Sequence, residues 1–177
     1  CALPIFKLQL TECAYICGRY EAAKAYFEEM LEHAADEEDL AEIKKRYMIL
    51  NSYTGNQDRV IDLGIQALKH LGFNINTKML PLQIVKEILY GKVLFRSSRL
   101  ETIKNAPIVT DKRVTNALEI LTIMVASANM KDKNLFVLIV LKIGNLSAKY
   151  GNSLYSPLAY AAYSLVLGAV MGNFKKA

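Results

Sequence analysis

The stretch Gly18-Arg19-Tyr20-Glu21-Ala22-Ala23 stands between two runs of residues with helical periodicity. Glycine adopts the left-handed backbone conformation without strain, so Gly18 is expected to end the first helix. Ala23 carries a side chain small enough for two helices to cross closely, and Phe27 follows on the same face one turn later. These features predict two antiparallel helices joined by a tight turn, with Tyr20 packed into that turn.

The same pattern returns 37 residues later, where Gly55-Asn56-Gln57-Asp58-Arg59-Val60 leads into Ala67. Gly172-Asn173-Phe174 begins a third copy, and Gly151 stands where another run of helical periodicity stops. The glycine turn, with its aromatic and alanine positions, resembles the turn of a tetratricopeptide repeat. The repeat positions that we infer are Gly18, Tyr20, Ala23, Phe27, Gly55, Val60, Ala67, Gly151 and Gly172.

Helical periodicity dominates the rest of the chain, and no alternating strand pattern stands out. We therefore expect an all-α fold: an α-α superhelix of antiparallel helical hairpins, tetratricopeptide-like but divergent, with about eight helices. Residues 1–177 would form one domain. Residues 1–72 would hold two hairpins, residues 73–133 an irregular helical middle, and residues 134–177 a further hairpin that is truncated at its C-terminus.

Local signals place several helix starts. Pro81 suits the first turn of a helix, and the apolar residues that follow it on one face are Leu82, Val85, Ile88 and Leu89. Thr110-Asp111 and Asn134 are candidate N-terminal caps of two later helices.

Charge and cysteine content restrict the classes of partner. The net charge is +5, yet ten of the seventeen acidic residues lie within the first 42 positions. The basic residues elsewhere are scattered, so we expect solvated helix faces rather than nucleic-acid binding. Cys13 and Cys17 have no histidine nearby and are expected to be small buried hydrophobes in a reducing, cytoplasmic compartment. Leu154–Met171 carries no formal charge, and we interpret it as a buried helix rather than a membrane insertion.

The sequence contains none of the common catalytic motifs. The sequence lacks a phosphate-binding glycine loop, a paired metal-ligand motif and a nucleophile elbow. The two histidines, His33 and His70, stand late in predicted helices, where they would contact terminal carbonyls. We therefore expect no enzyme activity, no metal and no cofactor in this fragment.

Three longer strings together resemble a specific family: the tetratricopeptide-like superhelical region of large bacterial multidomain signalling proteins. They are Leu8–Ala23, Asp62–Gly72 and Leu141–Ser153, and the stretch Ile103–Asp111 adds to the likeness. In that family a serine/threonine kinase-like domain and a predicted signal-transduction ATPase precede the region, and a GAF domain and a histidine kinase or cyclase output module follow it. The resemblance implies a non-catalytic regulatory array whose protein partners are other domains of the same chain.

Such arrays bind protein segments on a concave surface. The residues expected to line this groove are Lys44, Tyr47, Met48, Asn51, Lys142 and Asn145. Two alternatives stay open: a passive spacer between signalling domains, and a small-molecule-sensing domain with a pocket among helices 135–171. Truncation at Ala177 would also leave the last helix uncapped, which predicts a homodimer contact there.

Overall fold

The computed structural model describes residues 3–95, 101, 103 and 105–171. Within these ranges the chain is helical, which confirms the predicted all-α fold of about eight helices. The helices are α1 (Leu3–Ile16), α2 (Tyr20–Glu32), α3 (Glu37–Tyr53), α4 (Gln57–His70), α5 (Leu80–Leu94), α7 (Lys112–Lys131), α8 (Lys133–Tyr150) and α9 (Ser156–Met171), with a short 3-10 turn at Thr77–Met79. In the described residues β-type pairing is limited to one isolated bridge between Ile108 and Asn152.

Glycine turns end the helices α1, α3 and α4. Gly18, Gly55 and Gly72 have φ angles of 72°, 78° and 80°. The amide after each glycine donates a hydrogen bond of 2.8–2.9 Å to the carbonyl five residues earlier, as from Arg19 to Ala14. This is the Schellman arrangement, which satisfies carbonyls that the end of a helix leaves free. Gly172 lies outside the described residues.

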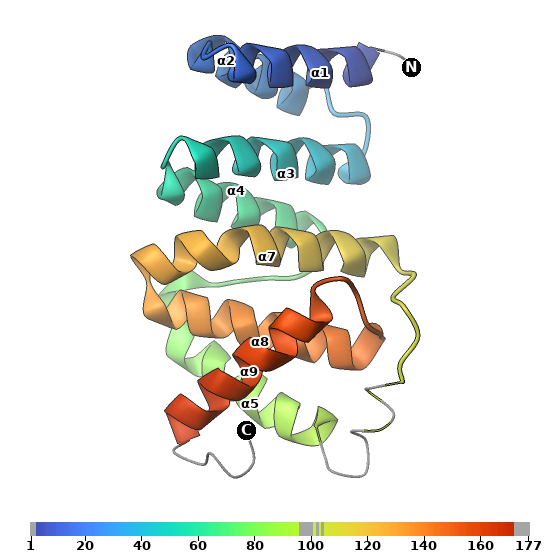
Figure 1. The fold of residues 1–177 in the computed structure, drawn as a ribbon, viewed down its shortest axis with the longest axis vertical. Coiled ribbons are helices and arrows are strands. Elements are labelled where there is room, and N and C mark those ends of the chain that lie inside the picture. The colour runs from blue at the N-terminus through green and yellow to red at the C-terminus, as the bar shows by residue number, and fades with distance from the viewer. Residues whose placement is uncertain (1–2, 96–100, 102, 104, 172–177) are drawn as a thin grey trace.

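The helices pack in pairs and the pairs stack (Figure 1). α1 packs on α2, α3 on α4, and α7 on α8, while α4 and α3 both contact α7. α5 departs from chain order, because it packs against α8 on the far side of the α7–α8 pair from α4. The chain therefore leaves the stack after α4 to form α5, and it is back in the stack at α7. This excursion is why the 37-residue period is lost in the middle of the sequence.

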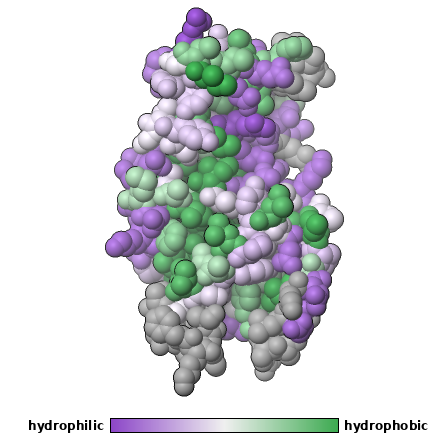
Figure 2. Space-filling model, in the orientation of Figure 1, coloured by the Kyte–Doolittle hydropathy of each residue, from purple (hydrophilic) through white to green (hydrophobic). Residues whose placement is uncertain are grey.

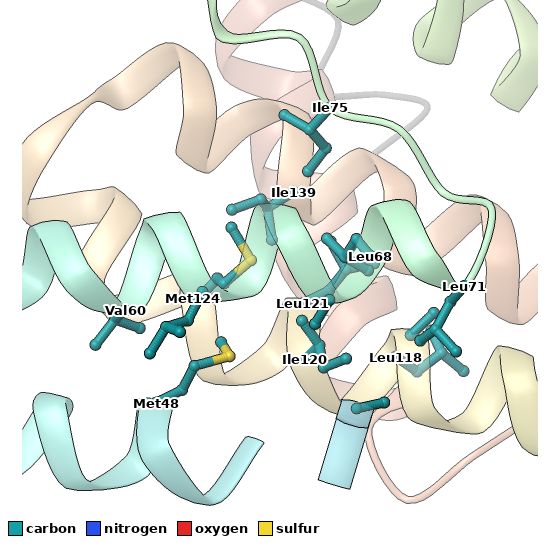
Figure 3. Close-up of a cluster of buried hydrophobic side chains, with 14 of the residues drawn as sticks. Met48, Val60, Leu68, Leu71, Ile75, Leu118, Ile120, Leu121, Met124 and Ile139 are labelled. Atoms are coloured by element: carbon teal, nitrogen blue, oxygen red, sulfur yellow. The ribbon is translucent and has the colours of Figure 1, made fainter. Parts of the chain in front are cut away.

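The main core lies where α3, α4, α7 and α8 meet (Figure 3). Met48 of α3 and Met124 of α7 are both fully buried and meet α4 at the same point. Gly64 of α4 makes this approach possible, since a Cβ there would lie 2.7 Å from Met124 Cγ and 3.0 Å from Met48 Cε. The repeat positions Ala23, Phe27, Val60 and Ala67 are also buried in the core.

Two local predictions are wrong. Cys13 and Cys17 are free but exposed, because they lie on the outer face of α1. The cap of α8 is Asp132, whose carboxylate accepts hydrogen bonds from the amides of Asn134 (2.8 Å) and Leu135 (3.2 Å), so Asn134 is not the cap. The predicted cap of α7 is confirmed, since Asp111 accepts from the amides of the first turn. No helix in the described part of the chain combines the length and the apolar character needed to cross a membrane.

Candidate functional surfaces

A hollow of about 560 Å³ lies among α2, α3 and α4. Tyr47 and Asn51, two of the predicted groove residues, line it. The ring of Tyr47 stacks on Phe27 with centroids 4.8 Å apart, and the guanidinium of Arg59 lies 5.6 Å from the ring centroid of Tyr47. Asn51 donates to the carbonyl of Tyr47 at 2.7 Å. The hollow thus has an aromatic floor whose side chains are held by core packing and by their own helix.

Lys44 and Met48, the other predicted groove residues of α3, lie elsewhere. Met48 is fully buried and packs in the core described above, so it does not line a groove. Lys44 is only 5% exposed, and burial together with the charge of Arg59 lowers the pKa of its amine. Of the four predicted groove residues on α3, only Tyr47 and Asn51 therefore line the hollow.

Lys142 and Asn145 tie α8 to α5 instead of lining the same hollow. Lys142 Nζ lies 2.9 Å from Oε1 of Glu87, in a pair whose side chains are less than one fifth exposed. Asn145 donates to Oε2 of Glu87 at 2.8 Å and to its backbone carbonyl at 2.9 Å. Both carboxylate oxygens of Glu87 are therefore used, and this cluster fixes where α5 sits on α8.

A second cross-helix cluster was not predicted. Lys45 of α3 donates to Glu119 of α7 at 2.5 Å and to Asn116 at 3.1 Å, and it pairs with Glu42 at 2.6 Å. Burial on its own would lower the pKa of Lys45, but the hydrogen bonds that Lys45 donates to Glu119 and Glu42 outweigh it and raise that pKa. The sequence shows that Glu42 and Lys45 are three residues apart, a spacing at which helical side chains can pair. It gives no local sign that Lys45 contacts Glu119, which is 74 residues away.

The outer face of α5 is apolar and exposed. Leu82, Val85, Leu89 and Val93, which we call the α5 stripe, are between 53% and 61% exposed. The opposite face, with Leu80, Gly91 and Leu94, is buried. Sequence periodicity placed Leu82, Val85 and Leu89 on a common face, but that face points away from the rest of the protein. A helix that is apolar on all sides is normally covered on all sides.

Apolar surface also gathers elsewhere. Figure 2 shows hydrophobic side chains on the lower half of the displayed face, where α8 and α9 lie. On α9, Leu158 and Leu165 are 71% and 74% exposed. The contact of α9 with a second copy stays a prediction.

The Tyr150–Ser153 segment, part of the family resemblance, forms a structural junction. Asn152 donates to the carbonyls of Ile103 (3.0 Å) and Ala106 (3.3 Å), and it accepts a hydrogen bond of 3.0 Å from the hydroxyl of Tyr160. One side chain thus joins the connection that precedes α7 to the first turns of α9. Its polar atoms are occupied by the protein itself, so the junction positions helices rather than a ligand.

Across the described residues, no group of three or more histidine, cysteine, aspartate or glutamate side chains is arranged to hold a metal ion. No family model matches the chain, and no curated protein or solved structure matches it either.

Proposed function

We propose that this chain is a non-catalytic protein-interaction and regulatory module built from helical hairpins. The observation that carries the proposal is the α5 stripe. Four large aliphatic side chains stand in a row on one helix face, each more than half exposed. Full burial of such a side chain contributes about 1.5–3 kcal/mol. A contiguous row of this kind is typical of a docking surface for another protein.

The partner that fits this surface is an amphipathic helix with acidic flanks. An apolar stripe along a helix presents anchors at the spacing that a second amphipathic helix can match. Lys86 and Lys92 are exposed and border the stripe on α5. Their charges favour acidic residues beside the apolar anchors of the partner. The family resemblance suggests that this partner helix belongs to another domain of the same signalling protein.

A designed peptide pair tests this proposal. One peptide carries leucines at helical spacing flanked by glutamates, and its matched control carries lysines in place of the glutamates. Fluorescence anisotropy should show saturable binding of the acidic peptide and weaker binding of the basic one. Leu89→Ser should weaken the acidic peptide by about tenfold or more, since it removes one apolar anchor. Leu165→Ser is the control, because Leu165 is an exposed leucine on α9 outside the stripe, and it should leave the affinity unchanged.

Other results would contradict the proposal. Absence of binding, or equal binding of the two peptides, would favour the passive spacer. A dimer in light scattering that becomes a monomer on Leu89→Ser would show that a second copy of this chain covers the stripe.

A further inference from the structure

A cavity of about 260 Å³ lies beside α5, which lines it with Lys86, Glu87 and Tyr90. Its apolar wall comes from α4, α7, α8 and the connection after α4. Leu68 and Leu121 belong to the buried core, and Phe73 and Leu146 pack against that core from its edge. The guanidinium of Arg113 lies 5.6 Å from the centroid of the Phe73 ring, on which it is positioned for a cation–π contact. The wall is therefore held in place by groups outside the cavity.

The polar side of the cavity is cationic. Lys86 of α5 and Lys142 and Lys149 of α8 line it, with Glu87 as the acidic residue among the lining side chains. Glu87 is already saturated by Lys142 and Asn145, as described above. Lys149 lies 4.7 Å from the ring centroid of Tyr150, and in the described residues neither Lys86 nor Lys149 forms an ion pair with a carboxylate. Two positive charges thus face an apolar wall without a carboxylate to neutralise them.

We propose that this cavity binds a small amphipathic anion: an apolar chain or ring that carries one carboxylate. The apolar part lies against Phe73 and Leu146, and the carboxylate lies between Lys86 and Lys149. Small-molecule sites are mostly apolar with a few polar groups that fix the orientation of the ligand, and this lining has that composition. The inference does not depend on docking on the α5 stripe, because none of the four stripe residues lines the cavity, although Lys86 borders both.

Octanoate is the probe, and octanol and octylamine are its neutral and cationic counterparts. An amide NMR titration should show saturable one-to-one shifts for octanoate, centred on Phe73, Leu146 and Lys149. Octanol and octylamine should bind more weakly, because they lack the negative charge. Lys86→Gln and Lys149→Gln should each weaken octanoate by about fivefold, the effect of one exposed ion pair. Lys92→Gln, on the same helix but outside the cavity, should change nothing.

Three results would overturn the inference. Octanoate could fail to give saturable shifts, or octanol could bind as well as octanoate. The shifts could also centre on Leu82 and Leu89, which would mean that the probe covers the α5 stripe. A larger side chain gives a second check: Leu146→Trp should fill the cavity and remove octanoate binding, while leaving binding of the acidic peptide to the stripe intact.

Discussion

The hydroxyl of Tyr160 donates a hydrogen bond of 3.0 Å to the side-chain oxygen of Asn152. Tyr163, three residues further along α9, is 3% exposed, and its hydroxyl has no partner. Asn145 Oδ1 is likewise buried without a partner, and it lies next to Gly91 together with the Tyr163 hydroxyl. Two tyrosines on one helix therefore differ in whether their polar atom is satisfied.

This difference predicts opposite effects of the same substitution. Tyr160→Phe should destabilise the protein by about 1 kcal/mol, because it removes a hydrogen bond and leaves Asn152 with an unused acceptor. Tyr163→Phe should be neutral or stabilising, since it removes a buried hydroxyl that has no partner. Urea unfolding of the two variants against the parent protein measures both effects. An equal loss in the two variants would mean that the Tyr163 hydroxyl has a partner in solution.

Alkaline pH should lower the free energy of unfolding through the same two residues. Burial raises the pKa of Tyr160 to about 12, and burial together with the nearby Glu87 charge raises the pKa of Tyr163 to about 12. The ordinary value is 10.0, so between these two values the unfolded chain loses protons that the folded protein keeps. The contribution of these two tyrosines to the free energy of unfolding is therefore fully present below pH 10, and it is lost as pH rises toward about 12. Tyr163→Phe should make that fall shallower, as urea titrations at successive pH values would show. If the free energy of unfolding of Tyr163→Phe falls with pH as steeply as that of the parent protein, this prediction is wrong.

Gly91 of α5 lies against the side chain of Tyr163 on α9. A Cβ at this position would overlap the Tyr163 hydroxyl and lie 3.0 Å from Asn145 Oδ1. Gly91→Ala should therefore destabilise the protein by about 1–3 kcal/mol, although alanine is the better helix former. In the double variant with Tyr163→Phe the worst overlap is absent, so part of the loss should be recovered. A double-mutant cycle measures the coupling. Strict additivity of the two substitutions would show that the helices have separated.

The sequence predicted the parts of this fold that depend on local chemistry. Gly18 and Gly55 are at helix ends because a left-handed residue is a local requirement, and Asp111 caps α7 through its own neighbouring amides. The position of α5 depends instead on α8, and the paired residues Glu87 and Lys142 are 55 residues apart in the chain. Periodicity alone therefore identified an apolar face on α5 but not the direction in which it points.

For the candidate surfaces, too, the sequence predicted what depends on neighbouring residues and not what depends on distant ones. Tyr47 and Asn51 both line the hollow beside α3, and whether a protein binds there stays a prediction. Met48, the residue after Tyr47, was grouped with them although the helical turn carries it into the core. Lys142 and Asn145 were predicted to be groove residues. Their pairing with Glu87 could not be predicted, because nothing local in the sequence links α8 to α5.

Acid should weaken the cluster of Glu42, Lys45 and Arg46 on α3. Burial on its own would raise the pKa of Glu42, but hydrogen bonds from Lys45 and Arg46 outweigh it and hold that pKa below its ordinary value of 4.5. A lowered carboxyl pKa contributes stability that is present above the unfolded value and is lost as pH falls through the folded value. Lys45→Met should reduce stability near neutral pH and flatten the loss on acidification between about pH 5 and 3. Urea unfolding across that range measures both effects.

Lys131→Met is the matched control for Lys45. Lys131 also forms an ion pair, with Asp58 at 2.8 Å, but its side chain is 44% exposed and that of Asp58 is 72% exposed. An exposed pair of this kind contributes little to stability. The control should therefore keep the acid profile of the parent protein. If both lysine variants flatten the profile equally, the effect comes from net charge and not from the Glu42–Lys45 pair.

Gly151 tests whether the junction before α9 depends on a backbone approach. Its φ is 117°, and a Cβ there would lie 2.5 Å from the carbonyl oxygen of Pro107. Gly18 also has a positive φ, yet a Cβ there would meet no atom within 4 Å. Gly18→Ala should thus cost about 1 kcal/mol for the backbone alone, and Gly151→Ala about 3 kcal/mol or more, because a clash adds to the strain.

Amide hydrogen exchange separates the two glycine variants more sharply than stability does. The Val109 amide donates to the carbonyl of Asn152 at 2.8 Å, and the Asn152 amide donates to the carbonyl of Pro107 at 2.9 Å. Gly151→Ala must push these two segments apart, so both amides should lose protection even under conditions where the helices stay folded. Gly18→Ala should leave them protected, since it acts at the other end of the stack. Retained protection of Val109 and Asn152 in Gly151→Ala would show that the segments join without the close approach, and the glycine would then be needed for its backbone angle alone.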